Sequence, residues 1–191
     1  MAQPQLDAAL HLFEVQADIA LKYGIDVGAR TIQLVGEIHD MTFCHIDTAL
    51  TLMESQSKAK VTIKINSNGG SVYNALAIVG RMQASKCKIV TEVYGACMSA
   101  ATMILAAGET RRMSKLAYIM HHEMSYEVAG THSQNKHNVL QAEREGETWA
   151  ITMEALTGTP KDVWREKGKA GIDWYLSSAE AKNMGIVDEL F

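Results

Sequence analysis

The sequence predicts an α/β fold built on a mainly parallel sheet, and two observations carry this prediction. Three segments in which apolar and polar residues alternate, as in strands, are each followed by a segment with apolar residues every three or four positions, as in helices. The 191 residues, 47% hydrophobic and 21% charged, are enough for one such domain and too few for two ordinary enzymes joined by a linker. A largely disordered chain is excluded by the same composition.

The chain begins with an expected helical arm, followed by a first strand and helix. Apolar residues recur at helical spacing over residues 6–23, and Gly24 ends the pattern. Residues 31–35 alternate as in a strand, and residues 46–53 again carry apolar groups at helical spacing. We therefore expect residues 1–29 to form an N-terminal arm or helix.

Two more strand–turn–helix units follow. Polar and glycine residues interrupt each unit after its strand, as is typical of turns. The expected segments are strands at 61–65 and 88–94, breaks at 66–71 and Gly95, and helices at 72–82 and 98–107.

The last third of the chain adds a short strand at 118–121 and a long helix at 134–156, whose charged residues are interpreted as a solvated face. Thr159 before Pro160 is typical of an N-cap with proline at the first helical position. Ser178 indicates another helix start. No repeat or interdomain linker is visible.

Composition excludes several classes of partner. Acidic residues number 22 and basic residues 18, without a basic block, so nucleic acid is not an expected partner. No uncharged apolar run approaches the ~18 residues of a membrane-spanning helix, and the acidic first twenty residues do not resemble a secretory signal. The three cysteines, Cys44, Cys87 and Cys97, show no CxxC spacing, which favours a reducing compartment. We expect a cytoplasmic protein.

Ser99 is the first candidate for chemistry. It lies in GACMSAA (residues 95–101), just after an expected strand and at the start of a helix, among residues small enough for close approach. The layout is similar to the strand-to-helix nucleophile turn of hydrolases, where the helix N-terminus favours developing negative charge. Taken alone, the same position is typical of a simple N-cap.

Two other motifs are suggestive. Gly69 and Gly70 allow backbone N–H groups to turn toward a ligand oxygen, although paired glycines are common in loops. His121 and His122 are neighbours on a strand and point to opposite faces, so at most one faces a cleft and a metal site using both is disfavoured.

Other polar groups are less informative. His39, Cys44 and His45 lack a recognised ligand spacing and a fourth partner, so no metal site is expected. Asp173 enters the apolar segment IDWYLS and would need a hydrogen-bond partner if buried; a histidine is one possible partner, and a solvated loop position is the alternative.

The order of these motifs resembles a known family. NSNGGSV at 66–72, GACMS at 95–99, the Ile–Met pair before His122 and the segment LSSAEAKNMGIVDEL at 176–190 are similar to the proteolytic subunit of the Clp ATP-dependent serine proteases. The resemblance covers about residues 30–190. It implies a ClpP/crotonase-like fold of repeated strand-strand-helix units over residues 30–191, with a protruding handle helix at about 123–158.

The resemblance also implies site residues and a reaction. It makes Ser99 the nucleophile, His122 the general base and then acid, and Asp173 the carboxylate that orients the imidazole. The backbone N–H groups of Gly70 and Ala100 correspond to the oxyanion hole. The implied activity is a serine endopeptidase that hydrolyses unfolded polypeptides through an acyl-enzyme.

The resemblance further implies an assembly of stacked homo-oligomeric rings with the active sites inside, served by an AAA+ unfoldase. The chain has no GxxxxGK[ST] motif, so ATP is expected to act only through that partner and no cofactor is expected in this chain.

Some positions depart from the family pattern. Asn68 replaces a proline, Ala100 and Ala101 replace methionine and glycine, and Glu123-Met124 replace glutamine and proline. These changes indicate a divergent member, such as one encoded by a phage, and Glu123 beside His122 would raise the histidine pKa if it faced it.

Two alternatives stay open. A catalytically inactive or scaffold ring subunit would also show altered residues around Ser99 and His122. A crotonase-like acyl-CoA hydratase or isomerase would share the paired backbone N–H groups but needs no serine nucleophile. A signal-peptide-peptidase-like enzyme is disfavoured because no lysine base or membrane segment is evident.

Overall fold

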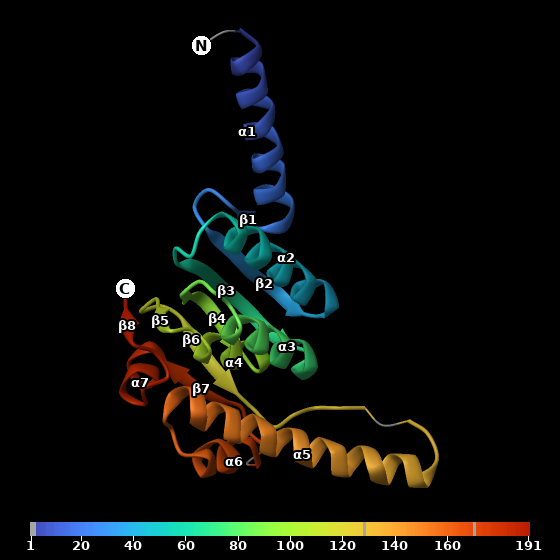
Figure 1. Cartoon of the computed structure of the whole chain (residues 1–191). Helices are drawn as coiled ribbons and strands as arrows, with labels where there is room; N and C mark the ends of the chain where they lie inside the picture. The colour runs from blue at the N-terminus through green and yellow to red at the C-terminus, as the bar shows by residue number, and fades with distance from the viewer. Residues whose placement is uncertain (1–2, 128, 170) are drawn as a thin grey trace.

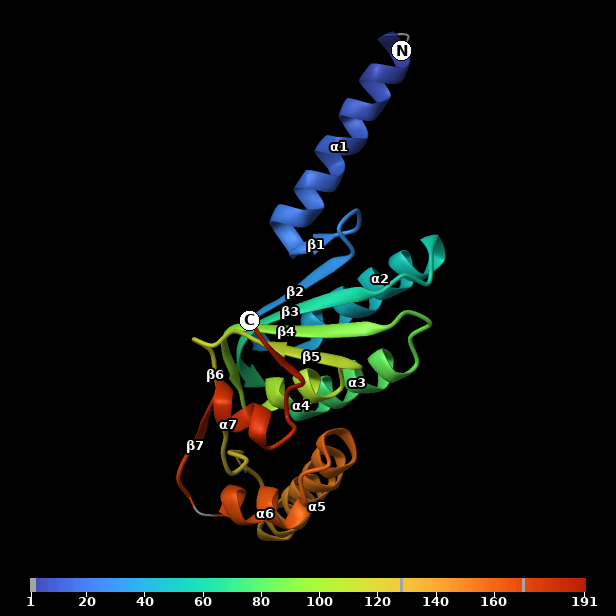
Figure 2. The same ribbon diagram turned by 90° about the vertical axis from the view of Figure 1, so that its left-hand side faces the viewer.

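The alternating strands and helices assemble into one twisted sheet with helices packed on it (Figures 1 and 2). This computed structural model describes residues 3–127, 129–169 and 171–191. The strands are β1 (Ile25–Asp26), β2 (Thr31–Ile38), β3 (Val61–Gly70), β4 (Ile89–Met98), β5 (Thr110–Met113), β6 (Tyr118–His121), β7 (Trp174–Ser177) and β8 (Glu189–Leu190). The helices are α1 (Gln3–Tyr23), α2 (Asp40–Gln56), α3 (Val72–Gln83), α4 (Ala100–Ala106), α5 (His132–Thr157), α6 (Lys161–Lys169) and α7 (Ser178–Asn183).

The sheet has the strand order β1-β2-β3-β4-β5-β8, with β6 paired to β4 and β7 paired to β6. Strands β2 to β5 are parallel, as are the β4–β6 and β5–β8 pairs, whereas β1–β2 and β6–β7 are antiparallel. Helices α2, α3 and α4 pack side by side and against the sheet. The prediction of an α/β fold with a mainly parallel sheet is confirmed.

Strand alternation directs one face of the sheet into the core. Val61, Ile63 and Ile65 of β3 are buried, while the intervening Thr62 and Lys64 are partly exposed. Cys97 of β4 is fully buried in the same core, and burial raises the pKa of its thiol. Its position is that of a small apolar core residue.

The expected breaks at residues 66–71 and at Gly95 are wrong. β3 continues to Gly70 and β4 runs through Gly95 to Met98. The β3–β4 register is irregular here: Ile65 pairs with Val93, but Ser67, two residues later, pairs with Cys97, four residues after Val93. The glycine and polar residues therefore mark a bulge-like shift in strand register, not a turn. The neighbouring parallel strands still supply hydrogen-bond partners for the backbone there.

Helix α1 extends away from the molecule at the β1 edge of the sheet, while α5 and α6 lie on the opposite side of the molecule (Figures 1 and 2). The predicted helix over residues 6–23 is confirmed with an earlier start at Gln3; residues 1–2 of the expected arm lie outside the described residues. Phe13 and Leu21 are 68% and 87% exposed along this helix. The arm thus presents apolar surface that the rest of the chain does not cover.

Two expected helix caps are corrected. The N-cap of α7 is Ser177, one residue before the expected Ser178, because Ser177 and Glu180 form a reciprocal capping box. α6 begins at Lys161, so Pro160 precedes the helix instead of occupying its first position and Thr159 is not the N-cap. The Thr159 hydroxyl instead donates to the carbonyl of Met184, just after α7.

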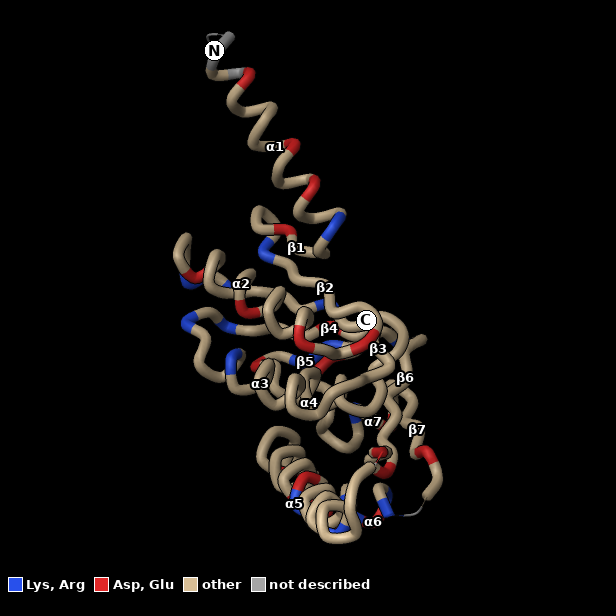
Figure 3. Tube along the Cα trace, turned by 90° about the vertical axis from the view of Figure 1, so that its right-hand side faces the viewer, with Lys and Arg blue, Asp and Glu red and all other residues tan. Residues whose placement is uncertain are grey.

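Lys and Arg are scattered among Asp and Glu along the trace (Figure 3). Within the described ranges, no helix is both long and apolar enough to cross a bilayer.

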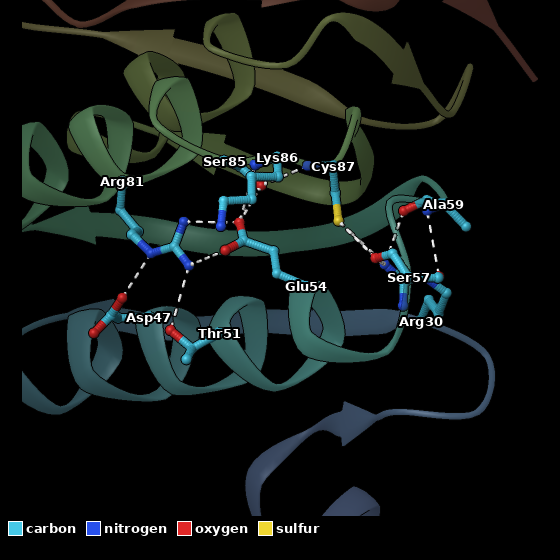
Figure 4. Close-up of polar contacts among 10 residues, drawn as sticks. All are labelled: Arg30, Asp47, Thr51, Glu54, Ser57, Ala59, Arg81, Ser85, Lys86 and Cys87. Atoms are coloured by element: carbon cyan, nitrogen blue, oxygen red, sulfur yellow. Dashed lines mark hydrogen bonds and ion pairs between the residues drawn. The ribbon is translucent and has the colours of Figure 1, made fainter.

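A charged cluster joins α2 to α3 and the turn after it (Figure 4). Arg81 donates to both carboxylate oxygens of Glu54 at 3.0 and 3.1 Å and to Asp47 at 2.6 Å. Glu54 also accepts from the Ser85 hydroxyl and the Lys86 backbone N–H. The hydrogen bonds from Arg81 chiefly, then those from Ser85 and Lys86, lower the pKa of Glu54 to about 2.

We expect Glu54 to stabilise the fold above pH 4.5 and to lose this contribution as the pH falls toward 2, because protonation must break the Arg81 contacts. The contribution at neutral pH is about 1–2 kcal/mol after allowance for solvent screening. Urea unfolding of wild type and Glu54→Gln at pH 7, 4.5 and 2.5 measures it. The two stability curves should converge at the acid end; a constant offset across the range would contradict this assignment.

Candidate active site

Ser99 occupies a strained turn between β4 and α4. Its backbone has φ 51° and ψ −126°, and a positive φ is uncommon for a residue with a side chain. The Ser99 N–H donates to the carbonyl of Met120 in β6 at 2.7 Å. The Ser99 carbonyl accepts from both the N–H and the hydroxyl of Thr102 in α4, at 3.0 and 2.7 Å. Hydrogen bonds on both sides therefore hold the turn.

The Ser99 hydroxyl is paired with His122. Ser99 Oγ lies 2.8 Å from His122 Nε2, although the two residues are 23 positions apart. Ser99 makes no side-chain capping hydrogen bond to α4, so its interpretation as a simple N-cap is wrong. Because Ser99 follows β4 and His122 follows β6, the parallel pairing of these strands brings the two side chains to one sheet end.

The neighbouring glycines make close contact with this turn. A Cβ on Gly69 (φ +95°) would lie 2.7 Å from Ser99 Cβ and 2.8 Å from the Met98 carbonyl. A Cβ on Gly70 (φ +144°) would lie 2.4 Å from the carbonyl of Ile38 in β2. Both positions thus require glycine, for the backbone conformation and for space.

Asp173 makes no hydrogen bond to Ser99 or His122 among the residues that the structure describes. β6 and β7 pair antiparallel as far as His121 opposite Trp174, and Asp173 directly precedes β7 while His122 directly follows β6. The Asp173 side chain is exposed, and within the described part of the chain it makes no hydrogen bond to His122. The structure therefore brings together Ser99 and His122, and among the described residues it does not bond Asp173 to either of them.

His121 points away from Ser99, as strand alternation requires. It is 5% exposed, and its Nε2 lies 3.1 Å from the backbone carbonyl of Trp164. Burial lowers the pKa of His121. Of the two adjacent histidines, only His122 meets the serine.

Two cavities open at Ser99 and His122. One of about 400 Å³ is also lined by Gly70, Asn68 and Tyr73. The other, of about 700 Å³, runs toward α5 and α6 and is lined by residues such as Trp149. The serine–histidine pair is thus accessible to an extended ligand from two directions.

The sequence comparisons identify the family. A profile of Clp proteases matches residues 18–191. The chain belongs to the Clp protease family. The ATP-dependent Clp protease proteolytic subunit of Bacteroides fragilis is 28% identical over 165 residues, which cover 84% of this chain and 78% of that protein. The resemblance found in the motifs is confirmed.

Asn66 and Ser67 belong to the NSNGG motif noted in the sequence, but sequence reasoning gave neither residue a role in supporting the site of this Clp protease. Asn66 Oδ1 accepts from the N–H of Ala96 at 2.9 Å and bridges β3 to the irregular part of β4. The Ser67 hydroxyl donates to the Gly36 carbonyl at 2.5 Å and accepts from the N–H of Gly69 at 3.1 Å. The polar residues of NSNGG were the available signal, since a paired strand interior has little need for them.

His39 and His45, which the sequence grouped with Cys44, each have another structural contact. His39 Nδ1 accepts from the N–H of Met41 and caps α2, His45 packs edge-on to the Tyr23 ring, and Cys44 is exposed. Among the described residues, no three His, Cys, Asp or Glu side chains are placed to hold a metal ion. Glu123 is exposed in the same described set and forms no ion pair there.

Proposed function

We propose that this chain is a serine endopeptidase with Ser99 as nucleophile, His122 as general base and acid, and Asp173 as the carboxylate that orients His122. The observation that carries the proposal is the 2.8 Å contact between Ser99 Oγ and His122 Nε2 at a residue held with φ 51°. Such a turn lifts a hydroxyl out of the capping position and offers it to a base.

The reaction follows from this geometry. Ser99 Oγ attacks the scissile carbonyl carbon while its proton passes to His122 Nε2. The oxyanion forms near the backbone N–H groups of Gly70 and Ala100, each worth about 3–4 kcal/mol if correctly aimed. Collapse breaks the C–N bond, the departing amine takes the proton from His122, and water then hydrolyses the Ser99 ester by the same base.

The proposed mechanism requires one particular tautomer of His122. If Nε2 accepts the Ser99 proton, Nδ1 carries the ring hydrogen and needs an acceptor. Asp173 is exposed and directly precedes β7, whose Trp174 pairs with His121, so a movement of the segment before β7 is the proposed route of its carboxylate to Nδ1. We propose that substrate or assembly brings about this contact.

The substrate and partners are proposed by analogy with the family. Unfolded polypeptides would enter a chamber formed by stacked rings of this chain, with an AAA+ unfoldase as the ATP-consuming partner. The name of the Bacteroides fragilis relative, an ATP-dependent proteolytic subunit, supports this assignment. The uncovered apolar residues of α1, such as Phe13 and Leu21, support association with further copies.

Covalent labelling tests the proposal. We expect a fluorophosphonate to add one adduct per wild-type chain and none to Ser99→Ala, because only the paired serine is activated. Intact mass gives the stoichiometry, and size-exclusion mass on the same samples gives the assembly state. A labelled Ser99→Ala, or acyl-CoA turnover that survives this substitution, would refute the serine mechanism and favour crotonase-like chemistry.

One observation favours a second candidate, an inactive ring subunit. Asp173 has no hydrogen bond to His122 within the described residues, and a histidine without an orienting partner is a poorer base. Large assembled particles of wild type that take up no label would establish this alternative.

A further inference from the structure

All three tryptophans of the chain surround His121. The Trp149 ring stacks on the imidazole with centroids 5.8 Å apart and an interplanar angle of 19°. Trp164 and Trp174 meet it edge-on at 5.4 and 6.5 Å, and they contact each other at 5.8 Å. We call His121 and these three residues the tryptophan box. It joins four elements, since its members come from α5, α6, β6 and β7.

The box is held by ring packing and by one directed hydrogen bond. The Trp164 carbonyl can only accept, so His121 Nε2 carries the hydrogen and donates to it at 3.1 Å. Among the described residues, the indole N–H groups of Trp149 and Trp164 are buried without a hydrogen-bond partner. The hydrogen bond from the imidazole to Trp164 ties β6 to α6, and the Lys167 ammonium of α6, 5.3 Å from the centroid of the Trp174 ring, ties β7 to the same helix.

The tryptophan box lies next in sequence to two residues of the proposed triad, because His121 precedes His122 and Trp174 follows Asp173. His121 and Trp174 form the last pair of the β6–β7 register, and His122 and Asp173 are the residues that directly follow β6 and directly precede β7. Side chains alternate across a strand, so the box holds one face of this strand pair while its other face meets Ser99. β7 pairs only with β6 among the described strands, and a single strand pairing gives it little independent stability.

We propose that His121 is a positioning residue: anchored by the tryptophan box, it sets the β6–β7 pair so that His122 meets Ser99 and Asp173 lies beside His122. This inference rests on the proposed peptidase function. It assigns a role in the reaction to a histidine that bonds to α6 rather than to Ser99 and that lines the cavity of about 700 Å³ with Ser99 and His122. The distance from His122 Nε2 to Ser99 Oγ is what the box controls.

Gly168 in α6 offers a probe of this role. A Cβ at Gly168 would lie 3.3 Å from His121 Nε2, a tight contact that presses the imidazole by a few tenths of an ångström. Alanine also raises the helix propensity of α6, so Gly168→Ala should not lower the melting temperature substantially. Gly80 in α3 is the matched control, because a Cβ there has nothing within 4 Å.

The experiment compares the fluorophosphonate reaction of wild type, Gly168→Ala, Gly80→Ala and His121→Phe, each as the full chain at 25 °C. We expect Gly168→Ala and His121→Phe to react about tenfold more slowly while still reaching one adduct per chain, because small misplacements of a base cost rate. His121→Phe keeps an aromatic ring but removes the donor to Trp164. Gly80→Ala should react as wild type does.

Tryptophan fluorescence gives an independent readout, because every tryptophan of the chain lies in the box. The emission spectrum should change in Gly168→Ala and stay unchanged in Gly80→Ala. The positioning role would be overturned if Gly168→Ala and His121→Phe both reacted with the fluorophosphonate at the wild-type rate, whether or not fewer adducts formed per chain. Either result would leave the peptidase function standing. Absence of an adduct on wild type would overturn the peptidase function, and the positioning role with it.

Discussion

Replacement of His122 by alanine is expected to reduce peptide hydrolysis by about 10⁵-fold or more, the loss typical of removing the base of a serine peptidase. Ser99 Oγ would lose the Nε2 acceptor that lies 2.8 Å away, and its proton would have no destination during attack. The fold should be little affected, because His122 is only partly buried and lies after the end of β6. Initial rates on an unstructured fluorogenic peptide measure the effect.

The matched control is His137→Ala, which removes an exposed histidine from α5. It should leave the rate of peptide hydrolysis unchanged. If His122→Ala retained more than a few per cent of the wild-type rate with an unaltered melting temperature, His122 could not be the base. The assignment of the histidine would then have to be abandoned.

Gly69→Ala is expected to damage both the fold and the site. The new Cβ would lie 2.7 Å from Ser99 Cβ and 2.8 Å from the Met98 carbonyl, and alanine would also have to adopt φ +95°. Backbone has to shift at the Ser99 turn, so we expect a loss of about 3–5 kcal/mol in the free energy of unfolding. Fluorophosphonate labelling of Ser99 should fall to background in the molecules that remain folded.

Gly36→Ala is the control that introduces backbone strain without a steric clash. Gly36 has φ +84° in the irregular part of β2, but a Cβ there has nothing within 4 Å. It should cost about 1 kcal/mol from backbone strain alone and leave labelling intact. Equal effects of the two substitutions on labelling would show that close packing of Gly69 on the Ser99 turn is unimportant. Urea unfolding and labelling kinetics on the same preparations distinguish these outcomes.

The sequence predicted the structure correctly where the alternation of apolar and polar residues matches the strand pairing in the sheet. The short strand at residues 118–121 has the predicted bounds, and alternation along it correctly separated His121 from His122. It failed at residues 66–70 and 95–98, because turn-type residues there lie inside strands that are paired on both sides. Local propensity carries no information about such neighbours.

The site itself was only partly accessible from the sequence. The Ser99–His122 contact depends on the pairing of β4 with β6, and the motif resemblance, rather than spacing, selected these two residues. The distance between Asp173 and His122 follows from the path of the chain before β7, which no local pattern encodes. The tryptophan box was also missed, because three tryptophans far apart in the sequence give no sign of meeting around one histidine.

The pairing of β4 with β6 affects when the newly synthesised chain can become active. The serine turn is completed only when its N–H reaches Met120, and the base arrives on that same distant strand. A half-made or partly unfolded chain therefore carries a serine without a base, and closure of long loops is a slow event in folding. Under the proposed mechanism, hydrolytic capacity appears only once β6 has paired with β4, so the unpaired chain does not attack itself or its neighbours.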